Sequence, residues 1–285
     1  MSVNDLVLIT GGDGFTGRHL SKYLIDHNFN CYSLKSNILD KESLSSEILD
    51  VRPDFVIHLA AISFTAEKNS ELIYATNLIG TENLLKALSR SPYHCKKLII
   101  ASSAAIYGNQ NKEPFNENIL PMPVSHYGIS KLAMEHMCRN YNKELPITIT
   151  RPFNYTGLGQ DINFLVPKIV HAFKKEYKSI ELGNIDVYRE FNDIRDVSEI
   201  YRLLITKDHS IDYINVCSGK LISISDIISS MEVISNTKIE VNINKDFVRE
   251  NEIKKLCGDP SKLHNILKFN PKYNLDNTLQ WMFNG

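Results

Sequence analysis

Short apolar runs and longer amphipathic segments alternate along this chain. The first run is Leu6-Val7-Leu8-Ile9, and others bounded by turn residues lie at 31–34, 55–59, 97–102, 147–150 and 213–216. Between them, apolar residues recur at three-to-four spacing over 15–26, 41–49, 71–88, 127–141 and 197–205. The short runs predict buried strands and the three-to-four spacing predicts helices. Together they predict an α/β fold with a doubly wound parallel sheet.

The pattern becomes less regular after about Gly157. Helices are expected over 161–175 and 260–267, and short strands over 179–182 and 238–243. We therefore expect a sheet domain formed by 1–157 and 191–222, with a smaller lobe over the sheet edge formed by 158–190 and 223–285. A chain of 285 residues, 43% of them apolar, is long enough for one large or two coupled domains.

A glycine-rich segment, Thr10 to Gly17, follows the first predicted strand and opens the first predicted helix. In such a unit Gly11 allows a tight turn, Gly14 lets backbone N–H groups approach a pyrophosphate, and Gly17 lets the helix pack closely on the sheet. The G-x-x-G-x-x-G spacing differs from the G-x-G-x-x-G fingerprint, so a plain turn is the alternative. The further candidate phosphate-site residues of the segment are Asp13, Phe15, Thr16 and Arg18.

Composition narrows the possible functions. A net charge of −1 argues against general adhesion to nucleic acid or to an acidic membrane surface. Five cysteines without a C-x-x-C pair, and no secretory signal or membrane-length apolar run, lead us to expect a reduced, soluble, cytoplasmic protein. Nine histidines include no H-x-x-x-H pair with a carboxylate partner, so we predict no metal site.

The candidate chemistry lies in Ser103, Tyr127 and Lys131. Tyr127 and Lys131 stand four apart at the start of a predicted helix, so both side chains can share one face. A nearby ammonium favours phenolate and brings a phenol, with a pKa near 10 in solution, closer to the neutral range. Ser103 ends the preceding strand and can stabilise charge on a substrate oxygen. Tyr93 and Lys97 share the spacing, which is therefore unspecific by itself.

These segments, with Ser103-Ala104-Ala105-Ile106-Tyr107-Gly108 and Tyr127-Gly128-Ile129-Ser130-Lys131, resemble the extended short-chain dehydrogenase/reductase superfamily acting on nucleotide sugars. His58-Leu59-Ala60-Ala61, Thr76 to Thr81 and Arg151 to Gly157 are similar to the same superfamily. Within it, Arg151-Pro152-Phe153-Asn154, Gly157-Leu158-Gly159-Gln160, 183–191 and 213–219 most resemble GDP-4-keto-6-deoxy-D-mannose reductases. The resemblance implies a Rossmann domain and a sugar-nucleotide-binding lobe.

The resemblance also implies a reaction. A nicotinamide hydride would pass to the keto carbon of a nucleotide-linked 4-keto-6-deoxy sugar, GDP-4-keto-6-deoxy-mannose or a close hexose or heptose analogue. Tyr127 would deliver a proton, giving a 6-deoxy sugar nucleotide for surface polysaccharide. Similar 4,6-dehydratases carry acidic residues after the catalytic Ser/Thr, where this chain has Ala104 and Ala105, whose methyl groups cannot act as acid or base. A nucleotide-sugar 4-epimerase and a non-catalytic nucleotide-binding member remain alternatives.

The cofactor choice rests on the end of the second strand, Ser33-Leu34-Lys35-Ser36. NAD enzymes usually carry a carboxylate there, and this stretch has none, whereas Lys35 and Arg18 can face a 2′-phosphate. We therefore favour NADP(H), with NAD(H) possible; the alternative for both cations is solvated surface. By resemblance, Asn37 and Ile38 approach the adenine. The same resemblance adds these cofactor contacts: Leu59, Ala60, Ala61, Asn77, Tyr127, Lys131, Arg151 and Pro152.

The resemblance further implies contacts with the sugar nucleotide. Asn154, Arg189 and Arg249 match positions that contact the diphosphate, and Glu252 matches one that accepts from the nucleotide ribose. Alternatives are a surface ion pair of Arg189 with Glu190, and ordinary surface roles for Arg249 and Glu252. The remaining expected substrate contacts are Ser63, Ser103, Ala104 and Tyr127. By analogy, the helices at 71–88 and 127–141 are expected to form a homodimer.

Overall fold

A parallel sheet of six strands forms the centre of the molecule. The computed structural model describes residues 5–62, 69–207, 212–247 and 253–285. The strand order is β10-β5-β4-β3-β1-β2, and every pairing in this sheet is parallel. This confirms the predicted fold class. The strands are β1 Leu6–Thr10, β2 Asn30–Ser33, β3 Phe55–His58, β4 Lys97–Ala101, β5 Ile147–Pro152 and β10 Tyr213–Val216.

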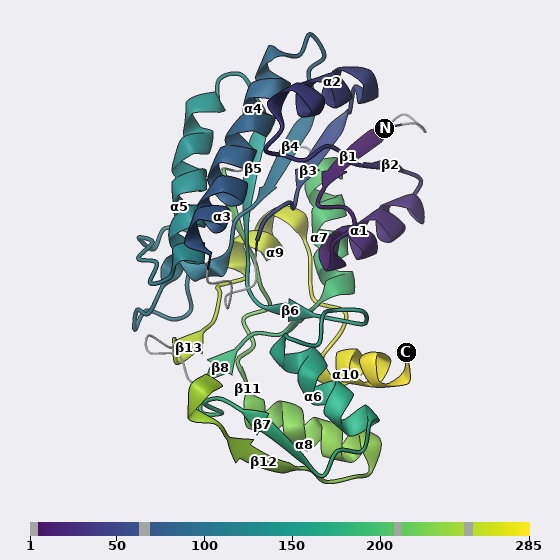
Figure 1. Cartoon of the computed structure of the whole chain (residues 1–285), viewed down its shortest axis with the longest axis vertical. Coiled ribbons are helices and arrows are strands. Elements are labelled where there is room, and N and C mark those ends of the chain that lie inside the picture. Colours follow the sequence, from purple (N-terminus) through teal and green to yellow (C-terminus); the bar gives the residue numbers. More distant parts are fainter. Residues whose placement is uncertain (1–4, 63–68, 208–211, 248–252) are drawn as a thin grey trace.

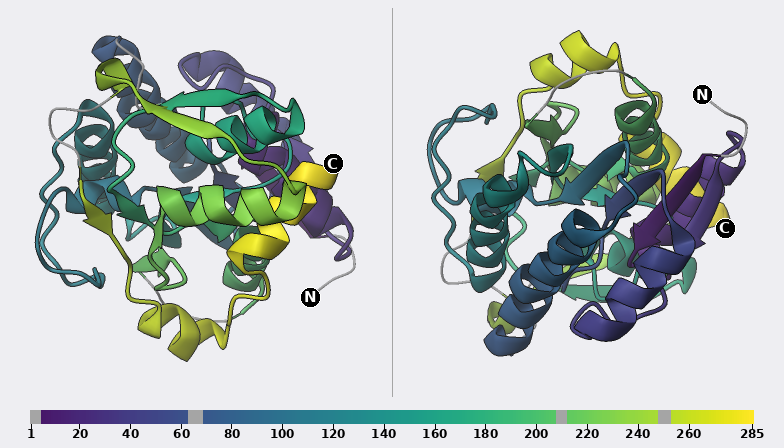
Figure 2. Two further views of the ribbon diagram at one scale, coloured as in Figure 1. Left: turned by 90° about the horizontal axis from the view of Figure 1, so that it is seen from below. Right: turned by 90° about the horizontal axis from the view of Figure 1, so that it is seen from above.

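Helices cover both faces of this sheet (Figure 2). Side chains alternate between faces along a strand, so Val7 and Ile9 of β1 lie in one core cluster and Leu8 lies in the other. Because both faces are buried, the strands read as continuous apolar runs. The first face carries α1 Phe15–Ile25, α7 Ile194–Thr206 and α9 Ser261–Leu267; the second carries α2 Lys41–Val51, α4 Thr81–Arg90 and α5 His126–Cys138.

The order of the strands reverses at β1, because β2 lies on one side of it and β3 on the other. In open α/β sheets a ligand crevice forms at the carboxyl ends of the strands beside such a reversal. Here those ends are Thr10 of β1 and His58 of β3, which are register partners. The topology therefore places the crevice beside the glycine-rich turn.

The helix expected over 71–88 contains a widened segment. The structure divides this region into α3 Ser70–Tyr74, a π-helix η1 Ala75–Gly80, and α4. The π-turn lies around Asn77, whose backbone oxygen accepts a hydrogen bond of 2.7 Å from the Thr81 side chain. Three-to-four spacing does not distinguish this widening from a regular helix, and such widened turns are frequent at functional sites.

A smaller lobe lies below the carboxyl ends of the sheet strands (Figure 1). Its core joins α6 Leu165–Lys174, α8 Ile224–Ser235 and α10 Leu275–Asn284 with the parallel pair β7 Ser179–Leu182 and β12 Glu240–Ile243. A three-stranded sheet of β8 Tyr188–Arg189, β11 Ile222–Ser223 and β13 Lys255–Leu256 adjoins this core. A separate pair, β6 Tyr155–Thr156 and β9 Asn192–Asp193, precedes α7.

The observed packing differs from the expected division of the chain in one place. The expectation assigns all of 223–285 to the lobe. Leu263, Leu267 and Phe269, in and after α9, instead belong to the core cluster of the first sheet face. The chain thus returns to the sheet after β13 before α10 completes the lobe. A single boundary at 223 cannot describe this return, because an isolated amphipathic helix does not reveal which of two cores buries it.

The short 3-10 helices follow strands or end longer helices. They are η2 Ala104–Tyr107, η3 Arg139–Tyr141 and η4 Lys245–Phe247. The helix expected over 127–141 is thus α5 extended by η3. Such tighter turns are common at the ends of α-helices.

A buried ion pair joins α5 to β5. Arg151 and Glu135 meet at 2.8 Å, and their side chains are 5% and 3% exposed. A second guanidinium bond of 3.1 Å joins Arg151 Nε to Glu135, and Arg151 Nη1 donates to the Tyr107 hydroxyl and to the Glu117 backbone oxygen, both at 3.1 Å. The Arg151 side chain therefore ties α5, Tyr107 and the segment around Glu117 to the central strand β5.

Replacing Glu135 by Gln is expected to lower the free energy of unfolding by about 3–5 kcal/mol, because the Arg151 guanidinium loses its counter-charge while it stays buried. Urea denaturation measures this loss. The matched control is Glu82→Gln, which breaks the half-exposed Lys86–Glu82 pair at 2.8 Å on α4 and is expected to cost less than about 0.5 kcal/mol. Equal losses in the two variants would contradict the assignment.

Candidate active site

The glycine-rich turn packs tightly on two sides and is open on the third. A Cβ added at Gly17 would lie 2.4 Å from the Gly11 backbone oxygen and 2.5 Å from the Gly12 Cα, so α1 lies directly against the turn. Gly11 has a φ of +68° and approaches the backbone of Ala60. A Cβ at Gly14 would meet only the Gly11 oxygen, at 3.1 Å. The open side therefore faces the N-terminus of α1.

These features fit the pyrophosphate of a nicotinamide dinucleotide. Gly14 is the N-cap of α1, no side chain caps the helix, and its first turn carries no acidic residue. The first N–H groups of the helix thus stay available for an anion, which the helix dipole favours. Asp13 and Gly14 are exposed, while Phe15 and Thr16 are half-buried beside them. The Ser102 hydroxyl, at the end of β4, is buried and has no hydrogen-bond partner among the described residues.

A buried histidine ties the turn to the neighbouring strand end. The Thr10 hydroxyl lies 2.6 Å from His58 Nδ1 and accepts from the Ala60 N–H at 3.1 Å. His58 Nε2 lies 2.8 Å from the Thr81 hydroxyl, which itself donates to the Asn77 oxygen. Thr81 Oγ1 must therefore accept from His58 Nε2–H, and His58 Nδ1 accepts from Thr10. Each of these hydrogen bonds therefore has a defined donor and acceptor, and His58 is neutral.

The same series of hydrogen bonds continues from Asn77 to α5. Asn77 is fully buried; its side-chain oxygen accepts from the Ile62 N–H at 2.8 Å, and its amide donates to the Ile62 oxygen at 3.2 Å. The amide also donates to Ser130 at 3.1 Å, and Ser130 donates to the Tyr127 backbone oxygen at 2.8 Å. The predicted cofactor segment 59–61 and the first turn of α5 are thus held in one network.

The three candidate catalytic side chains converge between β4 and α5. Ser103 follows β4 as the N-cap of η2, and its hydroxyl accepts from the Ala105 N–H at 3.1 Å. Tyr127 forms a hydrogen bond with Ser103. Lys131 is buried one turn along α5 and donates to the Ala101 oxygen at 2.7 Å. The predicted face of α5 is therefore the face that meets the end of β4.

Burial controls the protonation of these groups. Burial raises the pKa of Tyr127 to about 12, although the Ser103 hydrogen bond lowers it in part. Burial lowers the pKa of Lys131 to about 8. The expected lowering of the phenol pKa by Lys131 is thus absent here: burial dominates the shift, and Lys131 is not among the groups that change the pKa of Tyr127. Tyr127 is protonated at neutral pH, the state required of a proton donor.

Tyr155 also belongs to this site, although its position in the sequence does not predict it. Its hydroxyl lies 2.8 Å from that of Thr16 in α1, and its ring stacks on Phe15 with centroids 6.3 Å apart. Burial raises the pKa of Tyr155, and Tyr155 in turn raises the pKa of Tyr127. The contact joins residues 139 positions apart. The Arg151-to-Gly157 motif was the available signal, but only the fold brings it over the glycine-rich turn.

The residues predicted around the adenosine lie beyond β2 with different exposures. Lys35 and Asn37 are exposed, and the Lys35 ammonium lies 5.6 Å from the centre of the Tyr32 ring. Asn37 accepts from the Leu39 N–H at 2.9 Å. The Ile38 side chain is buried against Gly80, where an added Cβ would lie 2.7 Å away. Only the backbone of Ile38 is therefore placed to approach an adenine.

Arg18 and Arg151 are both held by protein atoms. The exposed Arg18 guanidinium donates to the Asp13 backbone oxygen and, at 3.4 Å, to the Gly159 backbone oxygen. The Arg151 guanidinium is taken up by Glu135, so this side chain is not available to a cofactor. Pro152 follows it at the half-buried end of β5, and Leu59, Ala60 and Ala61 are half-buried after β3. The cofactor roles of these residues stay predictions.

The predicted substrate contacts are only partly described. Ser63, Arg249 and Glu252 lie outside the described residues. The Asn154 side chain is exposed, and its backbone oxygen accepts from the Asn192 N–H at 2.9 Å. Arg189 donates to the Tyr188 and Lys254 oxygens, at 2.9 and 3.1 Å. Ala104 is buried in η2 behind Ser103.

Glu190 does not form the surface ion pair considered for Arg189. It is fully buried and accepts from the Gly258 N–H at 2.5 Å, the Ser218 N–H at 2.6 Å and the Asn192 amide at 3.4 Å. Glu190 follows directly after β8, and because neighbouring residues of extended backbone point to opposite sides, the buried Glu190 side chain leaves Arg189 pointing away from it. Glu190 therefore links the lobe to the loop after β10.

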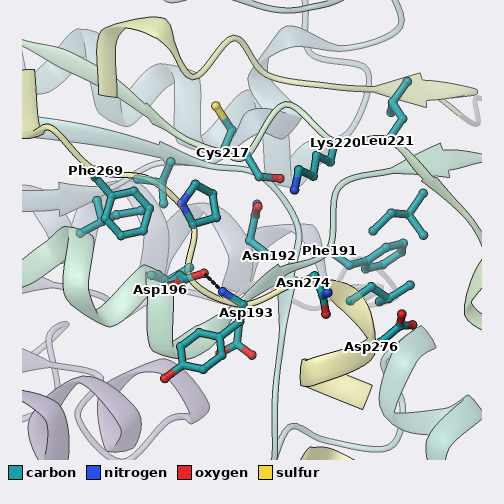
Figure 3. A pocket seen from close by; sticks show the side chains of 18 of the residues that line it. Phe191, Asn192, Asp193, Asp196, Cys217, Lys220, Leu221, Phe269, Asn274 and Asp276 are labelled. Carbon is teal, nitrogen blue, oxygen red and sulfur yellow. Dashed lines mark hydrogen bonds between the residues drawn. The ribbon is translucent and has the colours of Figure 1, made fainter. Parts of the chain in front are cut away.

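A separate cavity of about 530 Å³ lies between the lobe and α7. Figure 3 shows Asn192, Asp196, Cys217 and Lys220 around it. Ser103, Tyr127 and Lys131 do not line it. Asp196 is buried there and accepts from the Lys272 and Tyr273 N–H groups. Its carboxylate is therefore used in holding the segment before α10.

The described part of the chain offers neither a metal cluster nor a helix suited to a bilayer. Within 5–62, 69–207, 212–247 and 253–285, no three or more His, Cys, Asp and Glu side chains gather closely enough to hold a metal ion. In the same ranges, no helix combines the length and the apolar character that crossing a membrane requires.

Comparison with known proteins agrees with this geometry. The family model described as GDP-mannose 4,6 dehydratase matches residues 30–282. GDP-6-deoxy-D-talose 4-dehydrogenase of Aggregatibacter actinomycetemcomitans is 40% identical over 266 residues, covering 92% of this chain and 90% of that protein. GDP-6-deoxy-D-mannose reductase of Pseudomonas aeruginosa is 29% identical over 289 residues, covering 96% and 94%.

Solved structures give the same picture. RMD from Pseudomonas aeruginosa complexed with NADPH superposes with a TM-score of 0.91 at 28% identity, covering 98% of each chain. UDP-glucuronic acid 4-epimerase from Bacillus cereus, in complex with UDP-glucuronic acid and NAD, superposes with a TM-score of 0.89 at 26% identity, again covering 98% of each chain. Both solved neighbours bind a nicotinamide dinucleotide.

The buried, neutral His58 makes the free energy of unfolding depend on pH. Burial, and then the Lys131 charge, lower the pKa of His58 from 6.5 to about 3. Between these values the unfolded chain binds the extra proton, so the free energy of unfolding falls as pH falls, by about 1.4 kcal/mol per pH unit. His58→Gln is expected to reduce this slope between pH 6 and 4, measured by urea denaturation. The exposed control His27→Gln should keep it; an unchanged slope in His58→Gln would contradict the assignment.

Proposed function

The chain belongs to the GDP-mannose 4,6 dehydratase family, and we propose that within it this protein is an NAD(P)H-dependent reductase of a GDP-linked 4-keto-6-deoxy sugar. The family and its relatives support the coarser statement, a nicotinamide-dependent short-chain oxidoreductase of nucleotide sugars. The observation that carries the finer proposal is the convergence of Ser103, Tyr127 and Lys131 with only methyl groups at Ala104 and Ala105.

The protein groups can divide the chemistry of a ketone reduction among them. When bound, a reduced nicotinamide supplies the hydride that the sugar's C4 carbon receives. As the C=O π electrons move onto oxygen, the Tyr127 hydroxyl donates its proton to that oxygen and becomes phenolate. The Lys131 ammonium lies one helical turn away to stabilise the phenolate. Ser103 hydrogen-bonds Tyr127 and is placed to stabilise charge on the substrate oxygen.

The site offers little for a dehydration. Eliminating water between sugar carbons 5 and 6 needs a base for one proton and an acid for the leaving hydroxyl. The two positions after Ser103 carry neither. Ala104 is 2% exposed, so it has no room for a carboxylate without rearrangement of η2. Membership of a family described by a dehydratase therefore does not extend that activity to this chain.

The relatives support a proposal for the configuration of the product. 6-Deoxy-D-talose and 6-deoxy-D-mannose differ only at C4, the carbon that receives hydride. Since the talose enzyme is 40% identical and the mannose enzyme 29% identical to this chain, we propose the talo product. The sugar's orientation in the lobe decides this configuration, because the hydride and the proton come from fixed positions.

The cofactor proposal keeps NADP(H) as preferred and NAD(H) as possible. Lys35, exposed after β2, and Arg18, exposed in the first turn of α1, support it as cations that a 2′-phosphate could attract. The NADPH-bound RMD supports the same preference, whereas the NAD-bound epimerase supports the alternative.

The function is tested by following NADPH and NADH absorbance with GDP-4-keto-6-deoxy-mannose made in situ, and by identifying the product by NMR. Stoichiometric cofactor oxidation with a talo product supports the proposal. C4 interconversion of a GDP-hexose without net oxidation would identify an epimerase. Cofactor binding without turnover of any 4-keto sugar nucleotide would identify a non-catalytic member.

Tyr127→Phe removes the proton donor and is expected to lower kcat by roughly 10²–10⁴-fold, with little change in cofactor affinity. Steady-state kinetics and a cofactor titration measure the two effects. The matched control is Tyr93→Phe, because Tyr93 is exposed and also precedes a lysine by four residues. Retained turnover in Tyr127→Phe would overturn the role of Tyr127.

Lys131 is expected to set the alkaline limit of ketone reduction. Its pKa of about 8 means that the ammonium is lost as pH rises through 8, whereas Tyr127, with a pKa of about 12, keeps its proton. kcat/KM should therefore be level below pH 7 and fall above about 8. Lys131→Arg keeps its charge, so any activity it retains should decline only at higher pH. A decline at the same pH in both proteins would refute this origin.

A further inference from the structure

A carboxylate from α2 occupies the loop that follows β2. Glu47 Oε1 accepts from the Lys35 N–H at 2.8 Å, and Oε2 accepts from the Ser36 N–H at 2.7 Å. The Ser36 hydroxyl also donates to Oε2. Three donors of the loop thus converge on one anion, although Glu47 stands eleven and twelve positions along the chain from them. The end of β2 therefore has a carboxylate beside it that the strand's own residues do not supply.

This loop adjoins the glycine-rich turn. Ser33, the last residue of β2, packs against Gly12 so closely that a Cβ added there would lie 2.0 Å from Ser33 Oγ. A dinucleotide whose pyrophosphate lies at the N-terminus of α1 extends its adenosine half toward the end of β2, where the ribose 2′ position is recognised. The backbone donors of Lys35 and Ser36 follow directly after that position.

The Glu47 carboxylate is ionised at neutral pH. Burial pushes its pKa upward, but the hydrogen bonds from Ser36 and from the Lys35 and Ser36 N–H groups outweigh burial and leave the pKa below its usual range. Glu47 is half-buried, and Tyr32 of β2 is among its hydrogen-bond donors. The loop after β2 therefore carries a fixed negative charge.

We propose that Glu47 is a specificity-determining residue for the cofactor: its carboxylate holds the loop donors that a 2′-phosphate would use, and so limits the preference for NADP(H) over NAD(H). The proposal rests on the proposed function only in requiring a nicotinamide dinucleotide. Lys35 and Arg18 attract a 2′-phosphate, and Glu47 opposes them. A cofactor with a 2′-hydroxyl carries no charge there and escapes the repulsion.

The alternative is that Glu47 only stabilises the loop. The three hydrogen bonds from the loop to this carboxylate would hold the turn whichever cofactor is bound. A structural role of this kind affects NADPH and NADH alike, whereas a role in selectivity changes their ratio. The ratio of the two dissociation constants therefore separates the two roles.

The experiment titrates the full-length protein with NADPH and with NADH, following nicotinamide fluorescence without any sugar substrate. Glu47→Gln keeps the side-chain length and removes the charge, so NADPH should gain roughly tenfold on NADH. Glu47→Asp keeps the charge and should leave the ratio within about twofold. The matched control is Asp50→Asn, an exposed carboxylate three residues further along α2, which should also leave the ratio unchanged.

A second pair of probes isolates the adenosine half. Adenosine 2′,5′-bisphosphate and 5′-AMP differ only in the 2′-phosphate, and calorimetry should show the bisphosphate gaining on 5′-AMP in Glu47→Gln. The double variant Lys35→Asp with Arg18→Ala should move both ratios in the opposite direction.

Equal changes for both cofactors in Glu47→Gln, or a ratio that moves toward NADH, would overturn the proposal. So would a shift of the NADPH-to-NADH ratio in Asp50→Asn as large as that in Glu47→Gln. These outcomes concern binding alone, so they stand whether or not the protein reduces a 4-keto sugar; failure of the reductase assay with intact cofactor binding would instead remove the proposed function.

Discussion

The arrangement of the candidate site depends on one buried hydrogen-bond chain through His58. It begins at the Ala60 N–H, passes Thr10, His58 and Thr81, and reaches the Asn77 backbone in the π-segment. Each hydroxyl in it both donates and accepts, so no member can turn without leaving a buried group unpaired. This constraint holds the end of β1 at a fixed position relative to α4. The Asn77 side chain then carries it to α5.

The desolvation cost of burial determines which groups of the site are charged. Arg151 and Glu135 stay ionised because each supplies the other's counter-charge behind the site. Lys131 donates to a carbonyl oxygen and has no counter-ion at hydrogen-bond distance among the described residues, and burial lowers its pKa; Tyr127 has a hydroxyl partner, and burial raises its pKa. The same desolvation thus keeps the Tyr127 phenol protonated and makes the Lys131 ammonium easier to deprotonate. The glycine-rich turn avoids this cost by offering N–H dipoles instead of ions.

The sheet could be predicted well because its strands are buried on both faces. A continuous apolar run such as Leu6-Val7-Leu8-Ile9, too short for a helix and followed by a helical pattern, indicates a buried strand, and the six predicted strands lie where the runs place them. The strands of the smaller lobe were harder to predict from the sequence. Strands β8, β9, β11 and β13 are two residues each, too short for any periodicity. The apolar stripe of α9 indicates that one face of the helix is buried, but it does not indicate whether the sheet or the lobe buries it.

The amino-acid sequence by itself determined the fold class, the glycine-rich turn and the spacing that puts Tyr127 and Lys131 on one helical face, because these are properties of neighbouring residues. Only the tertiary structure decided which distant groups meet. It assigned the Arg151 guanidinium to Glu135, brought Tyr155 to Thr16, and placed the Glu47 carboxylate on the loop after β2, where the strand itself has none. Contacts across such separations depend on how the layers pack, and burial then sets the charge of each group.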